Sequence, residues 1–263
     1  MAPRNATTTA PAPGARGASS SATSSASSQT LDRGIRVLEI VTDAHRPPSI
    51  AEIAAELGVH RSIVYRILRT LEDHGLVRRD AAGRVHGAPG LAVLARRVEQ
   101  DLQAAALPEL SAISADLGMS AFVAVWDGQD CTTLVTVEPP RGNLVTQRPG
   151  TRHPLGRGAP GLAIAADLGA DELAAAAEAG LVEGPERPEV AVARAAGHAV
   201  SRNEVIAGVS SVAVPLRVRG QLPAALAVVY ATRHEDTDAI AGRLAAGAEA
   251  IAAALGEELL GRQ

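Results

Sequence analysis

The sequence has no lysine, one cysteine and very few aromatic residues, so all 25 of its basic residues are arginine. A single cysteine, Cys131, excludes an internal disulfide framework and any metal centre built from several cysteines, and it fits a reducing cytoplasm. Aromatic residues make up 2% of the chain, which argues against an aromatic groove for single-stranded nucleic acid and requires an aliphatic core. No apolar run approaches the ~18 residues of a membrane-spanning helix, so we expect no transmembrane helix.

Charge is distributed unevenly along the 263 residues, although the net charge is only −4. Residues 31–97 carry 11 arginines against 8 acidic residues, whereas residues 98–263 carry 12 arginines against 21 acidic residues. This asymmetry indicates a basic module joined to an acidic one. A length of this order allows one large domain or two modest ones.

The first 30 residues are nearly all Ala, Ser, Thr, Pro and Gly, and no Leu, Ile, Val or aromatic residue precedes Leu31. Such a segment cannot bury enough apolar area to offset the entropy lost on ordering, so we expect a disordered tail. It also lacks the apolar region of a secretory signal.

From Leu31 onward, the apolar residues follow helical spacing. Leu31, Ile35, Leu38 and Val41 predict a first helix, which a break at residues 45–48 ends. Ser49-Ile50-Ala51-Glu52 has the pattern of a capping box at the start of a second helix. Gly58 permits a tight turn before a third helix that ends near Gly75, and two short strands at 76–79 and 84–86 then predict a β-hairpin.

The third helix has a polar, basic face opposite its apolar stripe. That face consists of His60, Arg61, Ser62, Tyr65, Arg66 and Arg69, and the hairpin adds Arg78, Arg79 and Arg84. Arginine suits guanine edges and phosphates, and hydroxyl groups suit phosphates. The pattern predicts a winged helix-turn-helix that binds duplex DNA. The alternative is a plain helical hairpin with solvated arginines.

The rest of the chain mixes strands and helices in an order typical of an α+β domain. We expect helices at 91–106 and 109–117, strands at 121–126, 132–137 and 144–148, a helix from 156–161 to Leu168, helices at 171–179 and 186–199, strands at 209–218 and 224–230, and a closing helix at 236–260.

Several segments resemble the IclR-type family of bacterial transcription regulators. Residues 31–38, Leu-Asp-Arg-Gly-Ile-Arg-Val-Leu, and residues 53–68, Ile-Ala-Ala-Glu-Leu-Gly-Val-His-Arg-Ser-Ile-Val-Tyr-Arg-Ile-Leu, resemble its N-terminal half. Residues 153–161, His-Pro-Leu-Gly-Arg-Gly-Ala-Pro-Gly, residues 197–200, Gly-His-Ala-Val, and residues 203–209, Asn-Glu-Val-Ile-Ala-Gly-Val, are similar to its C-terminal half. The resemblance covers about residues 31–257.

The resemblance implies a winged helix-turn-helix at 31–92, a linker helix at 93–107 and a GAF-like effector-binding domain at 108–263. It implies a cytoplasmic repressor or activator that binds a palindromic operator as a homodimer or tetramer. It implies neither an enzyme nor a membrane protein, and no cofactor. Carried over from the family, the effector-binding positions are Ala159, Pro160, Ser201, Ser211, Ala227 and Val229.

Some of these positions depart from the family pattern. Ser211 stands where the family often has Cys, Ala227 and Val229 stand where hydroxyl residues are common, and Pro160 replaces a usual Ala. The changes make this wall of the pocket more apolar. We therefore expect a small organic acid with an aromatic or alkyl body, held by the backbone N–H groups that open the helix at Gly161 and by Arg152 or Arg157. The alternative for these arginines is a solvated surface.

Other functions find little support in the residues. Residues 156–161 match G-x-G-x-x-G, but no buried strand precedes them and a helical segment follows, so a turn that opens a helix is favoured over a dinucleotide site. The seven histidines are scattered without metal-ligand spacing. No nucleophile elbow occurs, and Cys131 reads as a small buried hydrophobe. An enzyme or nucleotide-binding protein that uses the C-terminal domain, or a protein-binding adaptor, remains the alternative.

Overall fold

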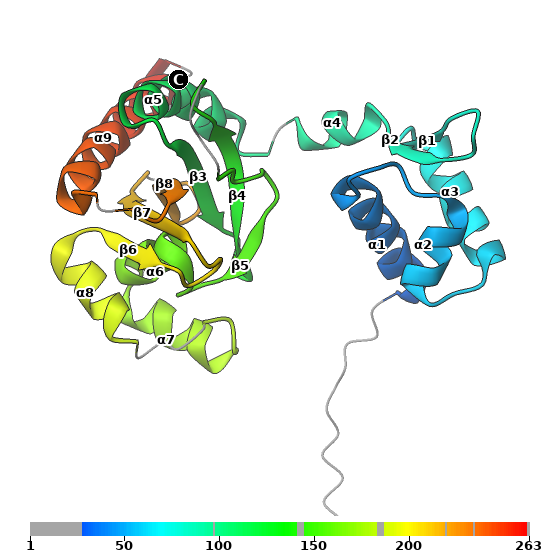
Figure 1. The fold of residues 1–263 in the computed structure, drawn as a ribbon, viewed down its shortest axis with the longest axis horizontal. Helices are drawn as coiled ribbons and strands as arrows, with labels where there is room; N and C mark the ends of the chain where they lie inside the picture. The colour runs from blue at the N-terminus through cyan, green and yellow to red at the C-terminus, as the bar shows by residue number, and fades with distance from the viewer. Residues whose placement is uncertain are drawn as a thin grey trace, which may run out of the picture. The chain divides into compact units, whose positions relative to one another are not determined.

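The computed structural model describes residues 28–96, 98–140, 145–182, 187–218, 220–233 and 235–261. They form two compact units, one up to Arg96 and one from Arg97 onward. Figure 1 shows the helices and strands of both units. The expected tail falls almost entirely on residues 1–27, which lie outside the described residues, so its disorder stays a prediction.

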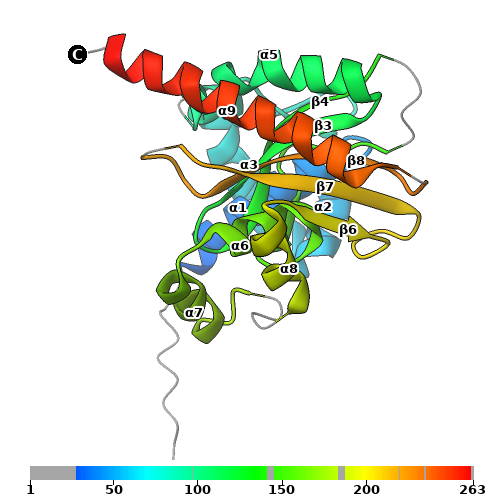
Figure 2. The same ribbon diagram turned by 90° about the vertical axis from the view of Figure 1, so that its left-hand side faces the viewer.

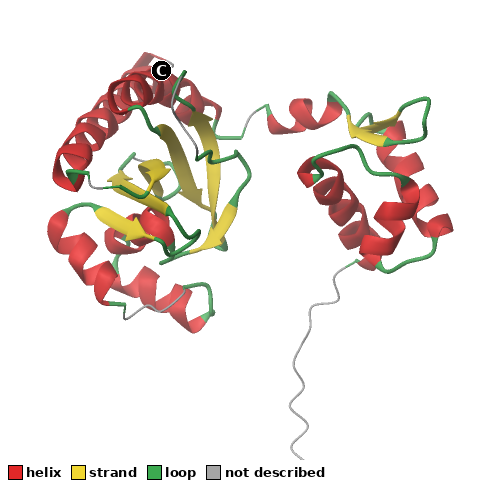
Figure 3. Ribbon diagram, viewed as in Figure 1, coloured by secondary structure: helices red, strands yellow, loops and turns green. Residues whose placement is uncertain are grey.

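The N-terminal unit consists of four helices and a two-stranded hairpin within the described residues (Figure 3). The elements are α1 (Gln29–Asp43), α2 (Ile50–Leu57), α3 (Arg61–Asp73), β1 (Val77–Arg79), β2 (Val85–Gly87) and α4 (Gly90–Ala95). The apolar faces of α1, α2 and α3 and the hairpin residues Val77 and Val85 share one aliphatic core. The winged helix-turn-helix expected from the sequence is confirmed.

The turn between α2 and α3 follows from local chemistry. Ser49 Oγ accepts the Glu52 N–H, and the Ser49 N–H donates to Glu52 Oε2 at 2.7 Å, so the predicted capping box is confirmed. Gly58 ends α2 with a φ of +64°, and its N–H donates to the carbonyls of Ala54 and Ala55. A left-handed residue at this position reverses the chain within a few residues, which lets Ala54 and Val64 pack in the same core.

The apolar stripe expected on α1 is only half buried. Val37 and Val41 are buried, but Leu31 and Ile35 are 64% and 48% exposed. The stripe follows from spacing along the helix alone, whereas the core shared with α2, α3 and the hairpin includes Val37 and Val41, and Leu31 borders an open hollow beside α3.

The C-terminal unit contains a six-stranded antiparallel sheet in the order β5-β4-β3-β8-β7-β6. Its strands are β3 (Ser120–Trp126), β4 (Asp130–Val137), β5 (Arg152–Pro154), β6 (Ala199–Arg202), β7 (Val209–Leu216) and β8 (Ala224–Ala231). Its helices are α5 (Gln100–Leu117), α6 (Gly158–Asp167), α7 (Ala170–Glu178), α8 (Pro188–Ala196) and α9 (Thr237–Gly261).

The two faces of the sheet bury separate cores (Figure 2). Because side chains alternate along a strand, Val123 and Leu226 point to one face and Phe122 and Ala227 to the other. Helices α5 and α9 cover the first face, and α6 and α8 cover the second. The expected α+β architecture is confirmed, and the second face carries a cavity beside Phe122 and Val229.

Four expected elements differ from the structure. The helix expected at 91–106 is broken between α4 and α5, and Pro108, expected to separate two helices, lies inside α5. Pro108 and Ala104 both lie on the exposed side of α5, where water can satisfy the carbonyl that loses its partner. No strand forms over the described part of 144–148; β5 pairs with β4 instead, and residue 199 begins β6 rather than ending a helix.

One helix, α9, is long and apolar enough between Thr237 and Gly256 to cross a membrane by length and composition alone. Its residues Ile240, Leu244 and Ile251 are buried in the core that covers the first face of the sheet. This packing explains the apolar composition of α9 as that of a core helix. The sequence did not indicate such a helix because no uninterrupted apolar run of this length occurs in it.

Candidate nucleic-acid interface and ligand cavity

The six residues predicted to form the outer face of α3 are all exposed. They are His60, Arg61, Ser62, Tyr65, Arg66 and Arg69. The opposite side of α3 is buried through Val64 and Leu68, so the helix is fixed in rotation by its core contacts. Within the described residues, no ion pair joins Arg61, Arg66 or Arg69 to a carboxylate. Their guanidinium groups therefore face solvent in a row along one side of the helix.

His60 and Ser62 also build the start of α3. His60 precedes the first helical residue, and its Nδ1 accepts the Ser62 N–H at 3.3 Å. The same nitrogen lies 2.9 Å from Ser62 Oγ. Because the first N–H groups of a helix lack partners inside the helix, these contacts stabilise the N-terminus of α3. The two side chains thus have a structural role that the sequence did not predict.

The three arginines of the hairpin differ in their surroundings. Arg79 donates to both carboxylate oxygens of Glu72 on α3, at 2.7 and 2.8 Å. Arg84 is half-buried and donates to the carbonyl of Pro47 at 2.9 Å. These two arginines hold the hairpin against the helices, so Arg78, which is exposed, is the wing arginine best placed to meet a phosphate.

The start of α2 carries a strongly ionised carboxylate. Hydrogen bonds from the backbone and side chain of Ser49, followed by one from Arg46, lower the pKa of Glu52 to about 2. Arg84 lies 3.5 Å from the same carboxylate. Glu52 therefore keeps its charge at neutral pH and joins the capping box to the hairpin.

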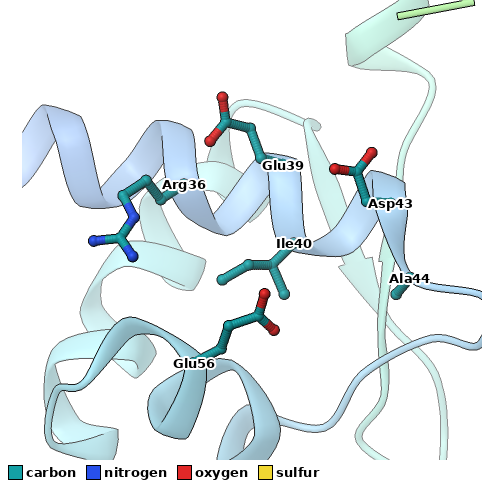
Figure 4. Close-up of a pocket in the computed structure, with 6 residues that line it drawn as sticks. All are labelled: Arg36, Glu39, Ile40, Asp43, Ala44 and Glu56. Atoms are coloured by element: carbon teal, nitrogen blue, oxygen red, sulfur yellow. The ribbon is translucent and has the colours of Figure 1, made fainter. Parts of the chain in front are cut away.

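A second polar feature of this unit is an acidic pocket of about 360 Å³ between α1 and α2. Figure 4 shows the carboxylates of Glu39, Asp43 and Glu56 there, with Arg36 as the accompanying cation. The N-terminal unit thus carries a basic row on α3 and an acidic pocket between two other helices. Phosphate is attracted by the first and repelled by the second, which gives the unit a preferred face for nucleic acid.

The C-terminal unit contains a cavity of about 50 Å³ on the second face of its sheet. Apolar side chains and a few polar groups line it: Phe122, Val145, Thr146, Gln147, His153, Gly158, Pro160, Ser201, Val205, Ile206, Val209, Ser210, Ser211 and Val229. Among the expected effector positions, this lining includes Pro160, Ser201, Ser211 and Val229. It does not include Arg157, Ala159 or Ala227; Ala227 and Ala159 are buried in the neighbouring core.

Two polar side chains of the cavity were not predicted. His153 is half-buried, and burial lowers its pKa, with the nearby Arg157 cation acting in the same direction, so its imidazole is neutral at neutral pH. Gln147 donates to Thr133 Oγ1 at 2.8 Å, which fixes the orientation of its amide. The sequence does not predict either residue at the cavity, because their positions depend on contacts with β4 that hydrophobic periodicity does not show.

An ion pair that the sequence did not predict lies at the edge of the cavity. Arg187 Nη1 donates to Glu204 Oε1 at 2.5 Å and to the carbonyl of Gly156 at 3.0 Å. Ser201 Oγ donates to Glu204 Oε2 at 2.8 Å. Partial burial disfavours the charge of Glu204, but the hydrogen bonds from Arg187 and Ser201 outweigh it and lower its pKa. Glu204 lies in a segment that carried the family resemblance, yet nothing in the sequence links it to Arg187.

The described residues offer neither a metal-binding cluster nor a reactive thiol. Across the described ranges, no group of three His, Cys, Asp or Glu side chains lies close enough to hold a metal ion. Cys131 is fully buried, and burial raises the pKa of its thiol to about 12, so a reactive thiolate does not form there at neutral pH.

A winged helix-turn-helix with an exposed arginine row, followed by a separate α+β domain with its own cavity, defines a transcription regulator that joins a DNA-binding domain to an effector domain. Comparisons with known families agree. Residues 30–81 match the IclR helix-turn-helix domain, and residues 95–253 match the bacterial transcriptional regulator IclR C-terminal domain. The chain belongs to the IclR family of bacterial transcription regulators, whose members are not enzymes.

Individual relatives match the chain over most of its length. The chain is 30% identical to the HTH-type transcriptional regulator Rv1719 of Mycobacterium tuberculosis, over 83% of this chain and 89% of that protein. The crystal structure of an IclR transcriptional regulator from Alicyclobacillus acidocaldarius is 26% identical, with a TM-score of 0.72 over 87% of this chain and 99% of that one. An IclR homolog from Microbacterium hydrocarbonoxydans, complexed with 4-hydroxybenzoate, is 22% identical, with a TM-score of 0.75 over 87% and 99% of the two chains, and shows the shared fold.

Proposed function

We propose that this regulator binds a palindromic operator as a homodimer or tetramer in the cytoplasm, with α3 in the major groove of each half-site. The observation that carries the proposal is the row of exposed arginines on α3, Arg61, Arg66 and Arg69. We assign DNA binding to residues 31–92, the linker to residues 93–107 and effector binding to residues 108–263. His60, Ser62, Tyr65 and the wing residue Arg78 complete the proposed interface, and Arg84 supports the wing through its bond to the carbonyl of Pro47.

Replacing Arg61 by alanine tests this proposal. Operators are first selected from a random duplex library with the wild-type protein, and binding is then measured by fluorescence anisotropy. If Arg61 contacts a guanine, Arg61→Ala costs about 1–3 kcal/mol of binding free energy and relaxes base preference at one position of each half-site. Affinity also falls steeply with salt, because each neutralised phosphate releases counterions.

Arg36→Ala serves as the matched control. It removes the same charge from the same unit, but Arg36 lies on α1 beside the acidic pocket. We expect this variant to bind the operator within about twofold of wild type, since long-range charge effects are screened at physiological salt. Equal losses in Arg36→Ala and Arg61→Ala, or selected sequences without two related half-sites, would contradict the proposed docking.

The proposed effector is a small organic acid with an aromatic or alkyl body. The cavity supports this choice because Phe122, Val145 and Val229 offer apolar surface and Ser211 and His153 offer a few polar anchors. The Microbacterium homolog was crystallised with 4-hydroxybenzoate, a molecule of this class. We expect 4-hydroxybenzoate to change operator affinity in the same anisotropy assay, through different affinities for two arrangements of the protein.

A further inference from the structure

The carboxylate of Glu204 lies at the N-terminus of α6, the place where the sequence predicts an anion site for the effector. Ser201 Oγ donates to it at 2.8 Å, and its contact with the backbone of Gly158, the first residue of α6, helps to lower its pKa. Arg187 holds its other oxygen at 2.5 Å. Gly158 and Ser201 both line the cavity, so two of its polar walls are bonded to a carboxylate of the chain itself.

A second donor at the start of α6 is also engaged. The Ala159 N–H donates to Ser211 Oγ at 3.4 Å, and Pro160 has no N–H. The backbone donors expected to bind an effector at this helix are therefore partly occupied by Glu204 and Ser211. An effector carboxylate that approaches α6 meets a negative charge in the position it would occupy.

The loop that carries Glu204 also lines the cavity. Val205 and Ile206 belong to the lining and are 46% and 60% exposed, so they lie at the rim of the cavity. Val205 packs directly on α6, since a Cβ on Gly158 would lie 3.2 Å from Val205 Cγ2. The cavity volume of about 50 Å³ is far below the ~300–1,000 Å³ of pockets that hold small organic ligands. An effector of several heavy atoms needs more room than this, and a movement of residues 203–208 would supply it.

The base of this loop can serve as a hinge. The Asn203 N–H donates to the carbonyl of Val209, and Asn203 Oδ1 accepts the Gly208 N–H, both at 2.8 Å. These bonds hold the two ends of the loop together, and Glu204 binds the loop to the start of α6. A movement of Val205 and Ile206 therefore requires that the contacts of Glu204 break.

We propose that Glu204 is an internal competitor that sets the head-group specificity of the effector cavity: the effector binds by displacing the Glu204 carboxylate from Gly158, Ser201 and Arg187 and putting an anionic group in its place. The inference rests on the proposed effector function. The hydrogen bonds that Glu204 gives up explain why the effector needs an anionic group. Once Glu204 leaves, Gly158 and Ser201 lose their acceptor and Arg187 keeps only Gly156 and Glu189. A neutral ligand with one carbonyl acceptor satisfies this set less well than a carboxylate with two charged oxygens.

The test is Glu204→Gln, measured by calorimetry with 4-hydroxybenzoate and its neutral match 4-hydroxybenzamide. Glutamine keeps the shape and one acceptor but loses the charge that strengthens the bonds. We expect the variant to bind 4-hydroxybenzoate on the order of tenfold more tightly than wild type, and 4-hydroxybenzamide within about twofold.

The matched control is Glu189→Gln. Glu189 is the second acidic partner of Arg187, at 3.3 Å from its Nε, but it is half exposed and has no bond to Gly158 or Ser201. This variant removes one negative charge beside the same arginine while α6 stays blocked. We expect its affinity for 4-hydroxybenzoate to match wild type within about twofold, and an equal gain in both variants overturns the proposal.

Hydrogen exchange on the wild-type protein gives a readout that does not depend on a variant. Saturating 4-hydroxybenzoate should speed exchange of the amides at 203–208, because the loop leaves α6; slower exchange there overturns the proposal. The binding experiments separate the two proposals. If 4-hydroxybenzoate alters operator binding but Glu204→Gln prefers the acid over the amide by the same factor as wild type, this inference fails and the proposed function stands. If the variant gains affinity for the acid but operator binding never responds, the inference stands and the effector function fails. If neither protein binds the acid, both fail.

Discussion

Cys131 lies on β4 with its thiol packed in the core between the sheet and α6, fully removed from solvent. Burial disfavours the thiolate, and the neighbouring charges of Asp130 and Asp127 add to the effect, so its pKa rises to about 12 from an ordinary value of 9.0. The interpretation of this residue as a small hydrophobe agrees with its position.

Thiol labelling tests this environment. At pH 8 the thiolate fraction of native Cys131 should be about a thousandfold below that of an ordinary thiol, since each pKa unit is a factor of ten. We expect Ellman's reagent to react only slowly with the native protein and at once with one thiol per chain in guanidinium chloride. Rapid stoichiometric labelling of the native protein would refute the buried position.

The surface residues of α3 and the ion pair at the cavity differ in how far sequence can predict them. Arg61, Arg66 and Arg69 share a face because of the helical period, which is local and readable. The partners of Arg84 and Glu204 are tertiary: Arg84 reaches Pro47, 37 positions away, and Glu204 reaches Arg187, 17 positions away. Periodicity places a side chain on a face but does not state what lies opposite it.

At the scale of the element, the junction between α3 and α4 depends on two glycines. Gly75 ends the α3 turn with a φ of +65°, and the Gly90 N–H at the start of α4 donates to its carbonyl at 2.9 Å. A Cβ on Gly90 would lie 2.8 Å from the carbonyl carbon of Gly75, closer than real contacts allow. The backbones approach too closely for any side chain.

Gly90→Ala should therefore destabilise the N-terminal unit by about 1–3 kcal/mol, as overpacking does. The control is Gly34→Ala inside α1, where an added Cβ has no atom within 4 Å. Because alanine is the better helix former, Gly34→Ala should stabilise the unit by about 0.5–1 kcal/mol. Urea unfolding followed by circular dichroism measures both; a neutral Gly90→Ala would show that α4 can shift away without cost.

The elements themselves were predictable where their pattern was strong and isolated. The capping box at Ser49 and the apolar stripes of α2 and α3 gave the helix-turn-helix directly. Pro108 misled because the cost of proline depends on whether the lost bond faces water, which periodicity does not state. The sequence did not predict β5, because this strand is three residues long, lies at the edge of the sheet and depends on pairing with β4.

At the scale of the whole molecule, the two units have separate cores. One core is formed by α1, α2, α3 and the hairpin, and the others lie on the two faces of the six-stranded sheet. The charge asymmetry of the sequence follows the same division, with an excess of arginine in 31–97 and of acidic residues in 98–263. The charge asymmetry thus agrees with the division into two units, although the boundary at Arg96 falls near the start of the linker helix expected at 93–107.

Separate cores predict separate unfolding. Differential scanning calorimetry should resolve two transitions, and a conservative substitution in one core should lower only one of them. Ile53→Val and Ile113→Val remove the same methylene from fully buried sites in different units, each at a cost of about 0.5–1.5 kcal/mol. The first should lower the transition of the smaller unit by roughly 4–8 °C, and the second that of the larger unit by roughly 2–4 °C, because the same free energy is spread over a larger unfolding entropy. A single transition that both substitutions lower alike would mean that the two units unfold as one cooperative body.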